Sequence, residues 1–222
     1  MKQEQRKKKI EHFAHTWVKI ERTIPDLNYY YYQCSKCYQV SFPIPELQKL
    51  IDYSKIHQFM FVQDWILALL YVIPKPIPGI TSFEKQIFLI LMEFAQEENI
   101  PTENPGFRAY NFGPYTERIE DVIIGLEDLG ALSIEGRKGA NGEYFSLTDE
   151  GRQLAESSFN KLTKRQQERL RDYRLLWQEW GPAGLMKYVY RKYREYRDKS
   201  IVLDRVLHRR RLGKLVWEET DD

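Results

Sequence analysis

The order of hydrophobic patterns between residues 64 and 159 constrains the fold of this 222-residue chain more than any other feature. Apolar residues recur at helical spacing in three successive segments, residues 64–72, 81–94 and 114–130. Prolines separate the first segment from the second, because proline disfavours helical conformation in the residue before it. Thr81 and Glu84 predict a capping box for the second helix. Gly113-Pro114 predicts the start of the third.

A hairpin and a fourth helix are expected after the third helix. Apolar and polar residues alternate over residues 132–134 and again over 145–147, and the glycine-rich segment 136–142 between them has turn chemistry. Thr148 is expected to cap a helix over residues 149–159. Three helices, a hairpin and a further helix make the layout of a winged helix-turn-helix, so we expect a mainly α, α+β fold.

Three motifs lie along this arrangement: Lys75-Pro-Ile-Pro-Gly79-Ile-Thr81, Phe112-Gly-Pro-Tyr115 and Leu147-Thr148-Asp-Glu-Gly151. Their combination resembles a widespread prokaryotic, phage-associated winged-helix family that is similar to the Panacea-type antitoxin domain. The resemblance covers residues 60–200 and includes the run Tyr188-Val-Tyr190-Arg-Lys-Tyr193-Arg-Glu-Tyr196. It implies a regulator or interaction module, and it carries over no catalytic residues.

The net charge of +2 is the sum of large opposed blocks. Residues 81–160 hold 15 acidic and 6 basic side chains, whereas residues 161–214 hold 6 acidic and 17 basic ones. This asymmetry predicts a polyanionic partner for the basic block, or docking of one block on the other within a chain or across a homodimer. We expect three parts: residues 1–45 with a zinc-ribbon-like hairpin, residues 46–160 with the winged domain, and residues 161–222 as a basic helical extension.

The N-terminal segment carries four side chains with metal-ligand spacing: His12, His15, Cys34 and Cys37. An alternating apolar run from Val18 and the tyrosines of residues 29–32 predict a hairpin that turns at residues 25–28. The first strand would begin beside the end of the second, so the four ligands would meet around one structural zinc ion. The alternative is two partly buried cysteines and two surface histidines.

The predicted third helix bears on nucleic-acid recognition, because this helix of a winged helix-turn-helix enters the major groove. Its expected apolar set is Tyr115, Ile119, Val122, Ile123, Leu126 and Leu129. Its exposed side chains are acidic, with Arg118 as the one cation, and would repel a duplex. Phosphate contact is therefore expected from the wing, through Arg137 and Lys138. In the alternative, the helix binds a protein partner through Glu117, Glu120 and Asp121.

The C-terminal block predicts two helices separated at Gly181-Pro182. In the second helix, three cations recur at helical spacing beside an aromatic-rich face: Lys187, Arg191 and Arg194. Cations interleaved with aromatic rings can contact phosphates and stack on bases. A second basic cluster follows at Arg209, Arg210 and Arg211. The alternative is that the aromatic residues form core and the cations solvate the helix.

Binding is favoured over catalysis, because the sequence has no Walker-type glycine loop and no Gly-x-Ser-x-Gly elbow. We expect a cytoplasmic, winged-helix transcription regulator that binds double-stranded DNA and is not an enzyme. An antitoxin-like module that binds a toxin or other protein is the alternative, and a metal-dependent nuclease around Asp26 is a remote one. The longest apolar stretch, residues 59–74, is too short and too polar for a membrane span.

Overall fold

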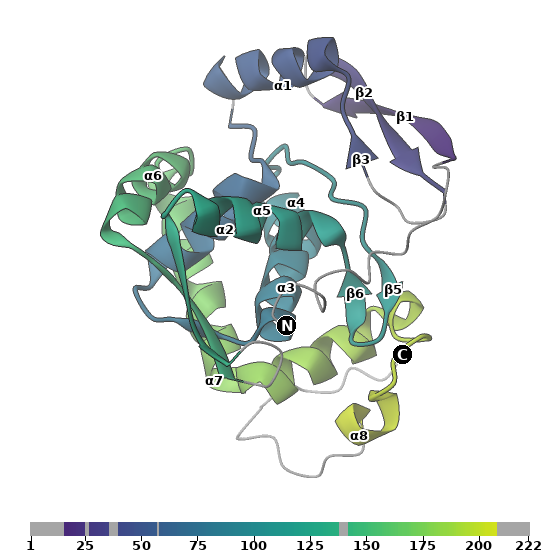
Figure 1. The fold of residues 1–222 in the computed structure, drawn as a ribbon, viewed down its shortest axis with the longest axis vertical. Helices are drawn as coiled ribbons and strands as arrows, with labels where there is room; N and C mark the ends of the chain where they lie inside the picture. Colours follow the sequence, from purple (N-terminus) through teal and green to yellow (C-terminus); the bar gives the residue numbers. More distant parts are fainter. Residues whose placement is uncertain (1–15, 25–26, 36–39, 57, 138–141, 208–222) are drawn as a thin grey trace, which may run out of the picture.

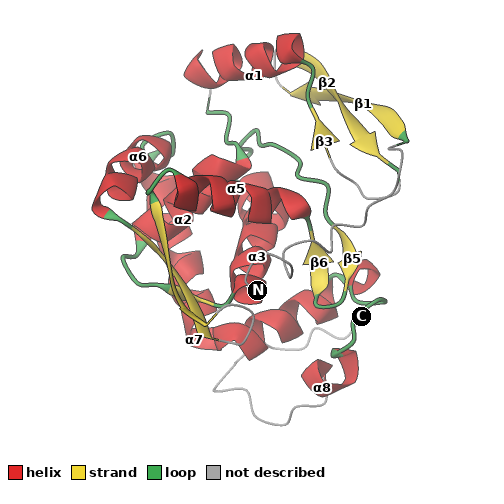
Figure 2. Cartoon of the chain, viewed as in Figure 1, coloured by secondary structure: helices red, strands yellow, loops and turns green. Residues whose placement is uncertain are grey.

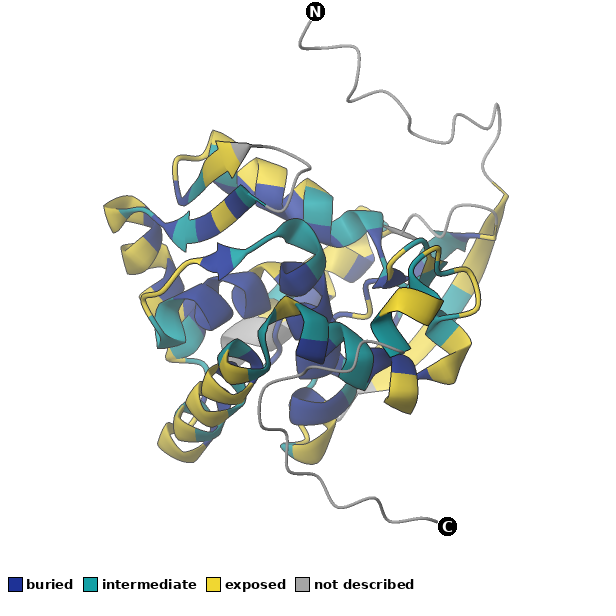
Figure 3. Cartoon of the chain, turned by 90° about the horizontal axis from the view of Figure 1, so that it is seen from below, coloured by how far each residue is buried: buried dark blue, intermediate teal, exposed yellow. Residues whose placement is uncertain are grey.

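A computed structural model gives the fold and describes residues 16–24, 27–35, 40–56, 58–137 and 142–207. Helices form most of it, and small antiparallel sheets complete a mixed α+β fold (Figure 1, Figure 2). Within the described part of the chain, no helix is both long enough and apolar enough to cross a membrane. The buried segments gather in the middle of the molecule, and the exposed ones form its periphery (Figure 3).

The N-terminal sheet has the strand order β1 (Trp17–Ile24), β2 (Leu27–Cys34) and β3 (Val40–Ser41). The predicted hairpin is confirmed, because β1 and β2 pair antiparallel along their whole length. Helix α1 (Ile44–Ile56) packs on this sheet, and a small core forms from Tyr29, Tyr31, Leu50 and Phe59. The sheet and α1 lie together at one end of the long axis of the molecule (Figure 1).

The larger core is built around two buried helices, α2 (Val62–Val72) and α3 (Ile80–Leu89). Helix α3 continues through a π-helical turn at Ile90–Phe94 into α4 (Ala95–Glu97). The predicted first helix is confirmed as α2, and the second as α3 with its continuation.

Two predicted helix starts are wrong. Helix α3 begins after Gly79, whose φ of 72° turns the chain, so Thr81 lies inside the helix and forms no capping box with Glu84. The third helix, α5 (Glu117–Asp128), begins after Thr116 rather than at Gly113-Pro114. Gly113–Tyr115 instead forms strand β6, which pairs with β5 (Arg108–Tyr110) in a two-stranded sheet that the sequence did not indicate.

The predicted hairpin after α5 is confirmed as β7 (Leu132–Arg137) and β8 (Gly142–Leu147). A short strand between α2 and α3, β4 (Ile77–Pro78), also joins this sheet, and the strand order is β4-β8-β7. The next helix, α6 (Asp149–Phe159), begins as expected, since Thr148 Oγ1 accepts a hydrogen bond from the Gly151 amide at 2.9 Å. Helix α6 packs on α2.

The C-terminal region consists of α7 (Lys164–Lys192), a 3₁₀ turn at Arg194–Tyr196 and the short α8 (Leu203–Leu207). The predicted division at Gly181-Pro182 is confirmed, because Gly181 has φ 64° and ψ 179° and kinks α7. The second half of α7 lies against α3 and β6, and it buries Leu185, Val189 and Tyr190. The aromatic-rich face of this segment is therefore core.

Candidate interaction surfaces

Helix α5 is fixed by an N-cap and by one apolar face. Thr116 Oγ1 accepts a hydrogen bond from the Arg118 amide at 3.2 Å and donates one to the Pro105 carbonyl at 2.7 Å. The buried side chains recur at helical spacing, and they are Ile119, Val122, Ile123 and Leu126. Leu129 was expected among them, but it lies just beyond the helix and is 74% exposed. The side of α5 opposite this apolar stripe faces solvent.

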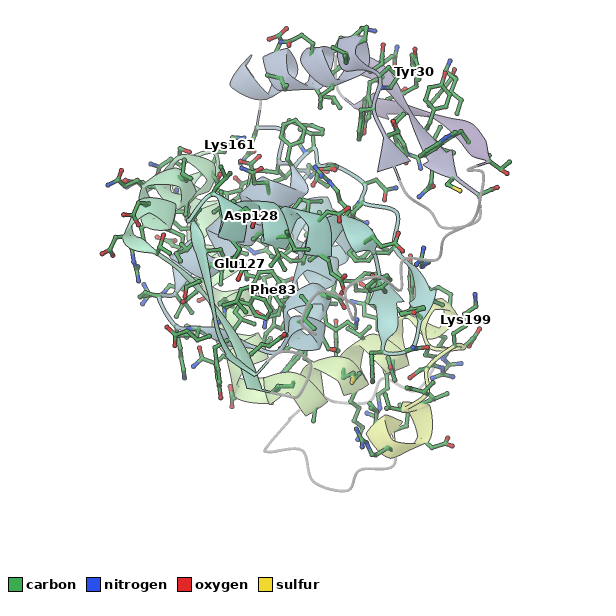
Figure 4. All side chains as sticks on the ribbon, in the orientation of Figure 1. Tyr30, Phe83, Glu127, Asp128, Lys161 and Lys199 are labelled. Atoms are coloured by element: carbon green, nitrogen blue, oxygen red, sulfur yellow. The ribbon has the colours of Figure 1, made fainter. Side chains whose placement is uncertain are left out.

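We call this exposed surface the α5 face and define it by five residues: Asp121, Ile124, Gly125, Asp128 and Leu129. Ile124 is 37% exposed, and nothing lies within 4 Å of the Cβ position of Gly125, so the centre of the face is open. The labelled Asp128 and Glu127 mark the C-terminal end of α5 in Figure 4. The α5 face thus combines two carboxylates with two apolar side chains and contains no cation.

Arg118 on α5 and Arg108 on the neighbouring strand β5 are already ion-paired. Arg108 from β5 donates to Glu117 at 2.7 Å, and Arg118 donates to Glu103 at 2.8 Å. Glu103 is buried and also accepts a hydrogen bond from the Val62 amide at 2.9 Å, which ties the Arg118 pair to the start of α2. These arginines therefore serve the packing of the domain, and no cation among the described residues forms an ion pair with Asp121 or Asp128 of the α5 face.

The three acids predicted to bind a partner lie in different environments. Asp121 is exposed on the α5 face, whereas Glu117 is half-buried in its pair with Arg108. Glu120 is half-buried too, and its charge acts on Glu84 and Tyr115 behind the helix. Only Asp121 of the three belongs to the α5 face, while Asp128, Ile124 and Leu129 were not predicted as partner-binding residues.

A buried ion pair lies behind α5. Lys85 Nζ is 3.4 Å from the Glu84 carboxylate and donates to the Pro114 carbonyl at 2.6 Å. Burial raises the pKa of Glu84, Lys85 lowers it and Glu120 raises it, with a net rise. Burial lowers the pKa of Lys85. The ammonium group connects α3 to β6, and β6 leads directly into α5, so this pair positions the helix that carries the α5 face.

Part of the basic C-terminal block is neutralised inside the protein. Arg165 and Arg169 on α7 pair with Glu98, and Arg169 also pairs with Glu97 at 2.7 Å. Lys161 Nζ lies 2.7 Å from Asp64. The basic block therefore docks in part on the acidic block within the chain, through Glu97 and Glu98 at the end of α4. Asp64 on α2 lies before the acidic block, and no acid of α5 takes part in these pairs.

Glu93, in the π-helical turn, accepts hydrogen bonds from several donors in the second half of α7 and at its C-cap. Its carboxylate accepts hydrogen bonds from Tyr193 at 2.8 Å and Tyr188 at 3.0 Å, and Lys192 Nζ lies 3.0 Å away. Burial, and then the Glu93 charge, raise the pKa of Tyr193. This cluster has a structural role, because its donors and acceptors satisfy one another at the helix interface.

The predicted basic stripe differs from Arg165 and Arg169 on α7, which are ion-paired. Arg191 and Arg194 are exposed and Lys187 is half-buried, and none of the three forms an ion pair with a residue that the structure describes. Arg194 lies just beyond α7, in the 3₁₀ turn, so the stripe is not continuous along one helix. These cations remain available for an anionic partner.

Several predicted site residues lie outside the described residues. They are His12, His15, Cys37, Lys138, Arg209, Arg210 and Arg211, and the side chain of Arg137 is not described either. Cys34 is fully buried at the end of β2. In the described ranges, no cluster of three or more His, Cys, Asp or Glu side chains could hold a metal ion. The structural zinc site stays a prediction.

A scan against protein-family models and searches of curated proteins and of solved structures found no match to this chain. The resemblance to the phage-associated winged-helix family therefore stays a prediction. One signal for the α5 face is present in the sequence, because Ile124 lies off the stripe that Ile119, Val122, Ile123 and Leu126 make at helical spacing. The pairing of Arg108 and Arg118 has no such signal, since it depends on β5 and on the loop that carries Glu103.

Proposed function

We propose that residues 62–159 form a winged helix-turn-helix domain. Helices α2, α3 and α5 take the places of its three helices, and β7 and β8 form its wing. The sheet order supports this proposal, because the short strand β4 before the second helix pairs with β8, the far strand of the hairpin. The two-stranded β5–β6 sheet is an addition between the second and third helices.

We further propose that the protein is an antitoxin-like regulatory module that binds a protein partner through the α5 face. The observation that carries this proposal is that Asp121 and Asp128 share the face with exposed Ile124 and Leu129, while the neighbouring arginines are already paired. Covering exposed apolar side chains with a partner removes their surface from water, which favours binding. The carboxylates favour a basic surface around that contact. A basic toxin has the expected chemistry.

Duplex DNA is a poor partner for the same face. DNA carries one negative charge per about 1.7 Å of helix axis, and groove contacts use mainly arginine, lysine, asparagine and glutamine. The α5 face offers none of these side chains. Inserting α5 into the major groove would bring two carboxylates towards phosphates without a compensating cation.

Charge reversal on the α5 face tests this function. The tagged full chain is expressed in its native cells, and co-purified proteins are compared for the wild type, Asp121→Lys/Asp128→Lys and the control Glu156→Lys, which changes an exposed acid on α6. We expect a basic protein to co-purify with the wild type and the control and to be lost from the double variant. A partner that is retained equally by all three would contradict the proposal.

A second function, nucleic-acid binding, is supported by the basic stripe. Lys187, Arg191 and Arg194 have no ion pair with any described side chain, whereas Arg165 and Arg169 in the first half of α7 do. We propose that the stripe contacts phosphates without reading sequence. Both proposals are binding functions, and neither includes a catalytic residue.

Salt dependence tests the second function. Binding to random-sequence duplex DNA is measured over a salt series for the wild type and for Lys187→Ala/Arg191→Ala/Arg194→Ala. The slope of log affinity against log salt should fall by about 0.9 for each phosphate that the variant no longer neutralises. The control Arg165→Ala/Arg169→Ala removes cations that are already paired and should leave the slope unchanged. Equal slopes for all three proteins would refute a role for the stripe.

A further inference from the structure

Strand β1 is an edge strand of unusual composition. The N-terminal sheet has the order β1-β2-β3, so within the described residues no strand pairs with the outer edge of β1. The strand has 8 residues, and both Trp17, 42% exposed, and Val18, 45% exposed, lie near its start. Long exposed edges invite pairing with another strand, and proteins often protect them with charged side chains, especially lysine. Here Lys19 and Glu21 give the edge both signs.

The hydrogen bonds between β1 and β2 identify which residues of β1 have backbone groups that point to the outer edge of the sheet. The Ser35 amide donates to the Thr16 carbonyl at 2.9 Å, so even-numbered residues of β1 make the hydrogen bonds to β2. The other strand agrees with this, because Tyr30, opposite Glu21, directs its amide away from β1 to the Glu46 carboxylate at 3.1 Å. The backbone groups of Lys19, Glu21 and Thr23 therefore point to the outer edge.

Two copies of β1 can pair antiparallel only in registers that place these outward residues opposite one another. Three such registers lie near the centre of the strand. One places Lys19 opposite Lys19 and another places Glu21 opposite Glu21, and each puts like charges on the twofold axis. The third places Ile20 on the axis and Lys19 opposite Glu21 of the second copy, twice. Charge therefore selects this third register.

The same register matches the other face of the sheet. Lys19 and Glu21 lie on its solvent face, and they already form an ion pair at 2.7 Å within one chain. Val18, Ile20 and Arg22 lie on the face that carries Tyr29 and Tyr31 of the small core. In the third register Ile20 meets Ile20, and the stem of Arg22 lies opposite Val18 of the second copy. The apolar contacts and the ion pairs thus favour the same register.

We propose that the protein forms a twofold-symmetric homodimer in which β1 pairs antiparallel with β1 of a second copy, with Lys19 opposite Glu21. About four backbone hydrogen bonds would surround the axis, two for each Lys19–Glu21 pair. The two three-stranded sheets become one continuous sheet. The interface is isologous, as closed twofold symmetry requires.

Charge variants test this interface in the full chain by sedimentation velocity and light scattering. We expect the wild type to have twice the 26.7 kDa chain mass. Lys19→Glu and Glu21→Lys should each weaken dimerisation at least about tenfold, because each turns both cross-axis pairs into like-charge contacts. The double variant Lys19→Glu/Glu21→Lys should restore the dimer. Lys164→Glu, the same charge change at an exposed position on α7, should leave it intact.

Mixing the two single variants gives the sharpest outcome and also controls for folding. One variant carries two acids on β1 and the other carries two cations, so the antiparallel register predicts a heterodimer from two weakly associating proteins. A wild-type protein that stays monomeric up to about 100 µM would overturn the proposal. So would a dimer that persists in both single variants, or a mixture of the two variants that does not associate.

Discussion

Replacing Lys85 by methionine should destabilise the protein by about 3–5 kcal/mol at pH 8, the usual cost of leaving one member of a buried ion pair alone. Methionine keeps the length and apolar character of the side chain, so packing changes little. The ammonium group is removed, however, and with it the 3.4 Å contact to Glu84 and the 2.6 Å hydrogen bond to the Pro114 carbonyl. The Glu84 carboxylate and the Pro114 carbonyl are then buried without the ammonium group that donates to them.

The loss of stability should shrink as the pH falls. Burial raises the pKa of Glu84 and Lys85 lowers it, so removing Lys85 raises this pKa further. A raised pKa means that the folded state holds the proton more tightly than the unfolded chain. The corresponding stability is fully present below the unfolded pKa of 4.5 and is lost as the pH rises through the folded pKa. We expect the deficit at pH 5 to be smaller by about 1–3 kcal/mol than at pH 8.

Urea unfolding, followed by circular dichroism at both pH values, measures the difference in the free energy of unfolding between the variant and the wild type. The double variant Lys85→Met/Glu84→Gln should recover about 2 kcal/mol relative to Lys85→Met at pH 8, because the amide removes the buried charge. It should also lose the pH dependence, although the Pro114 carbonyl stays unpaired. A Lys85→Met protein within about 1 kcal/mol of the wild type at both pH values would refute the reasoning.

Three further substitutions test the packing around this region by thermal unfolding. Gly113→Ala should cost about 1–3 kcal/mol, because Gly113 has φ 90° and a Cβ there would lie 2.7 Å from the Tyr190 ring; an unchanged melting temperature would contradict this. Gly125→Ala should stabilise by about 0.5–1 kcal/mol, since the position is helical and open; a loss of stability would show that the α5 face is packed. Tyr193→Phe should cost about 1 kcal/mol by removing the 2.8 Å hydrogen bond to Glu93, and a neutral result would mean that this bond adds nothing.

Elements with strong local signals were predictable from the sequence. Helices α2 and α6, the β7–β8 hairpin and the kink at Gly181 follow from periodicity, turn chemistry and a threonine cap, which are all local. The first two strands were found for the same reason, since β1 alternates, β2 carries a run of tyrosines and a short turn joins them. Helix α1 was missed, although Pro45 followed by Glu46 at the start of an amphipathic run is a recognisable helix start.

The errors arose where distant residues decide the local structure. Thr81 and Glu84 have the spacing of a capping box, but burial of Glu84 against Lys85 and the positive φ of Gly79 determine where α3 begins. Gly113-Pro114 looks like a helix start, yet Lys85 binds the Pro114 carbonyl and β5 pairs with the segment. For the same reason the α5 face could be predicted as acidic, but the ion pairing of its neighbouring arginines could not.

Site-specific photocrosslinking from the α5 face tests most directly whether this surface binds a protein rather than DNA. A photoreactive residue at position 124, in the centre of the face, is activated in the native cells, and the products are digested separately with nuclease and with protease. We predict a protein adduct that resists nuclease and disappears when Asp128→Lys is added. An adduct to nucleic acid, or a protein adduct that is insensitive to the charge reversal, would contradict the proposed function.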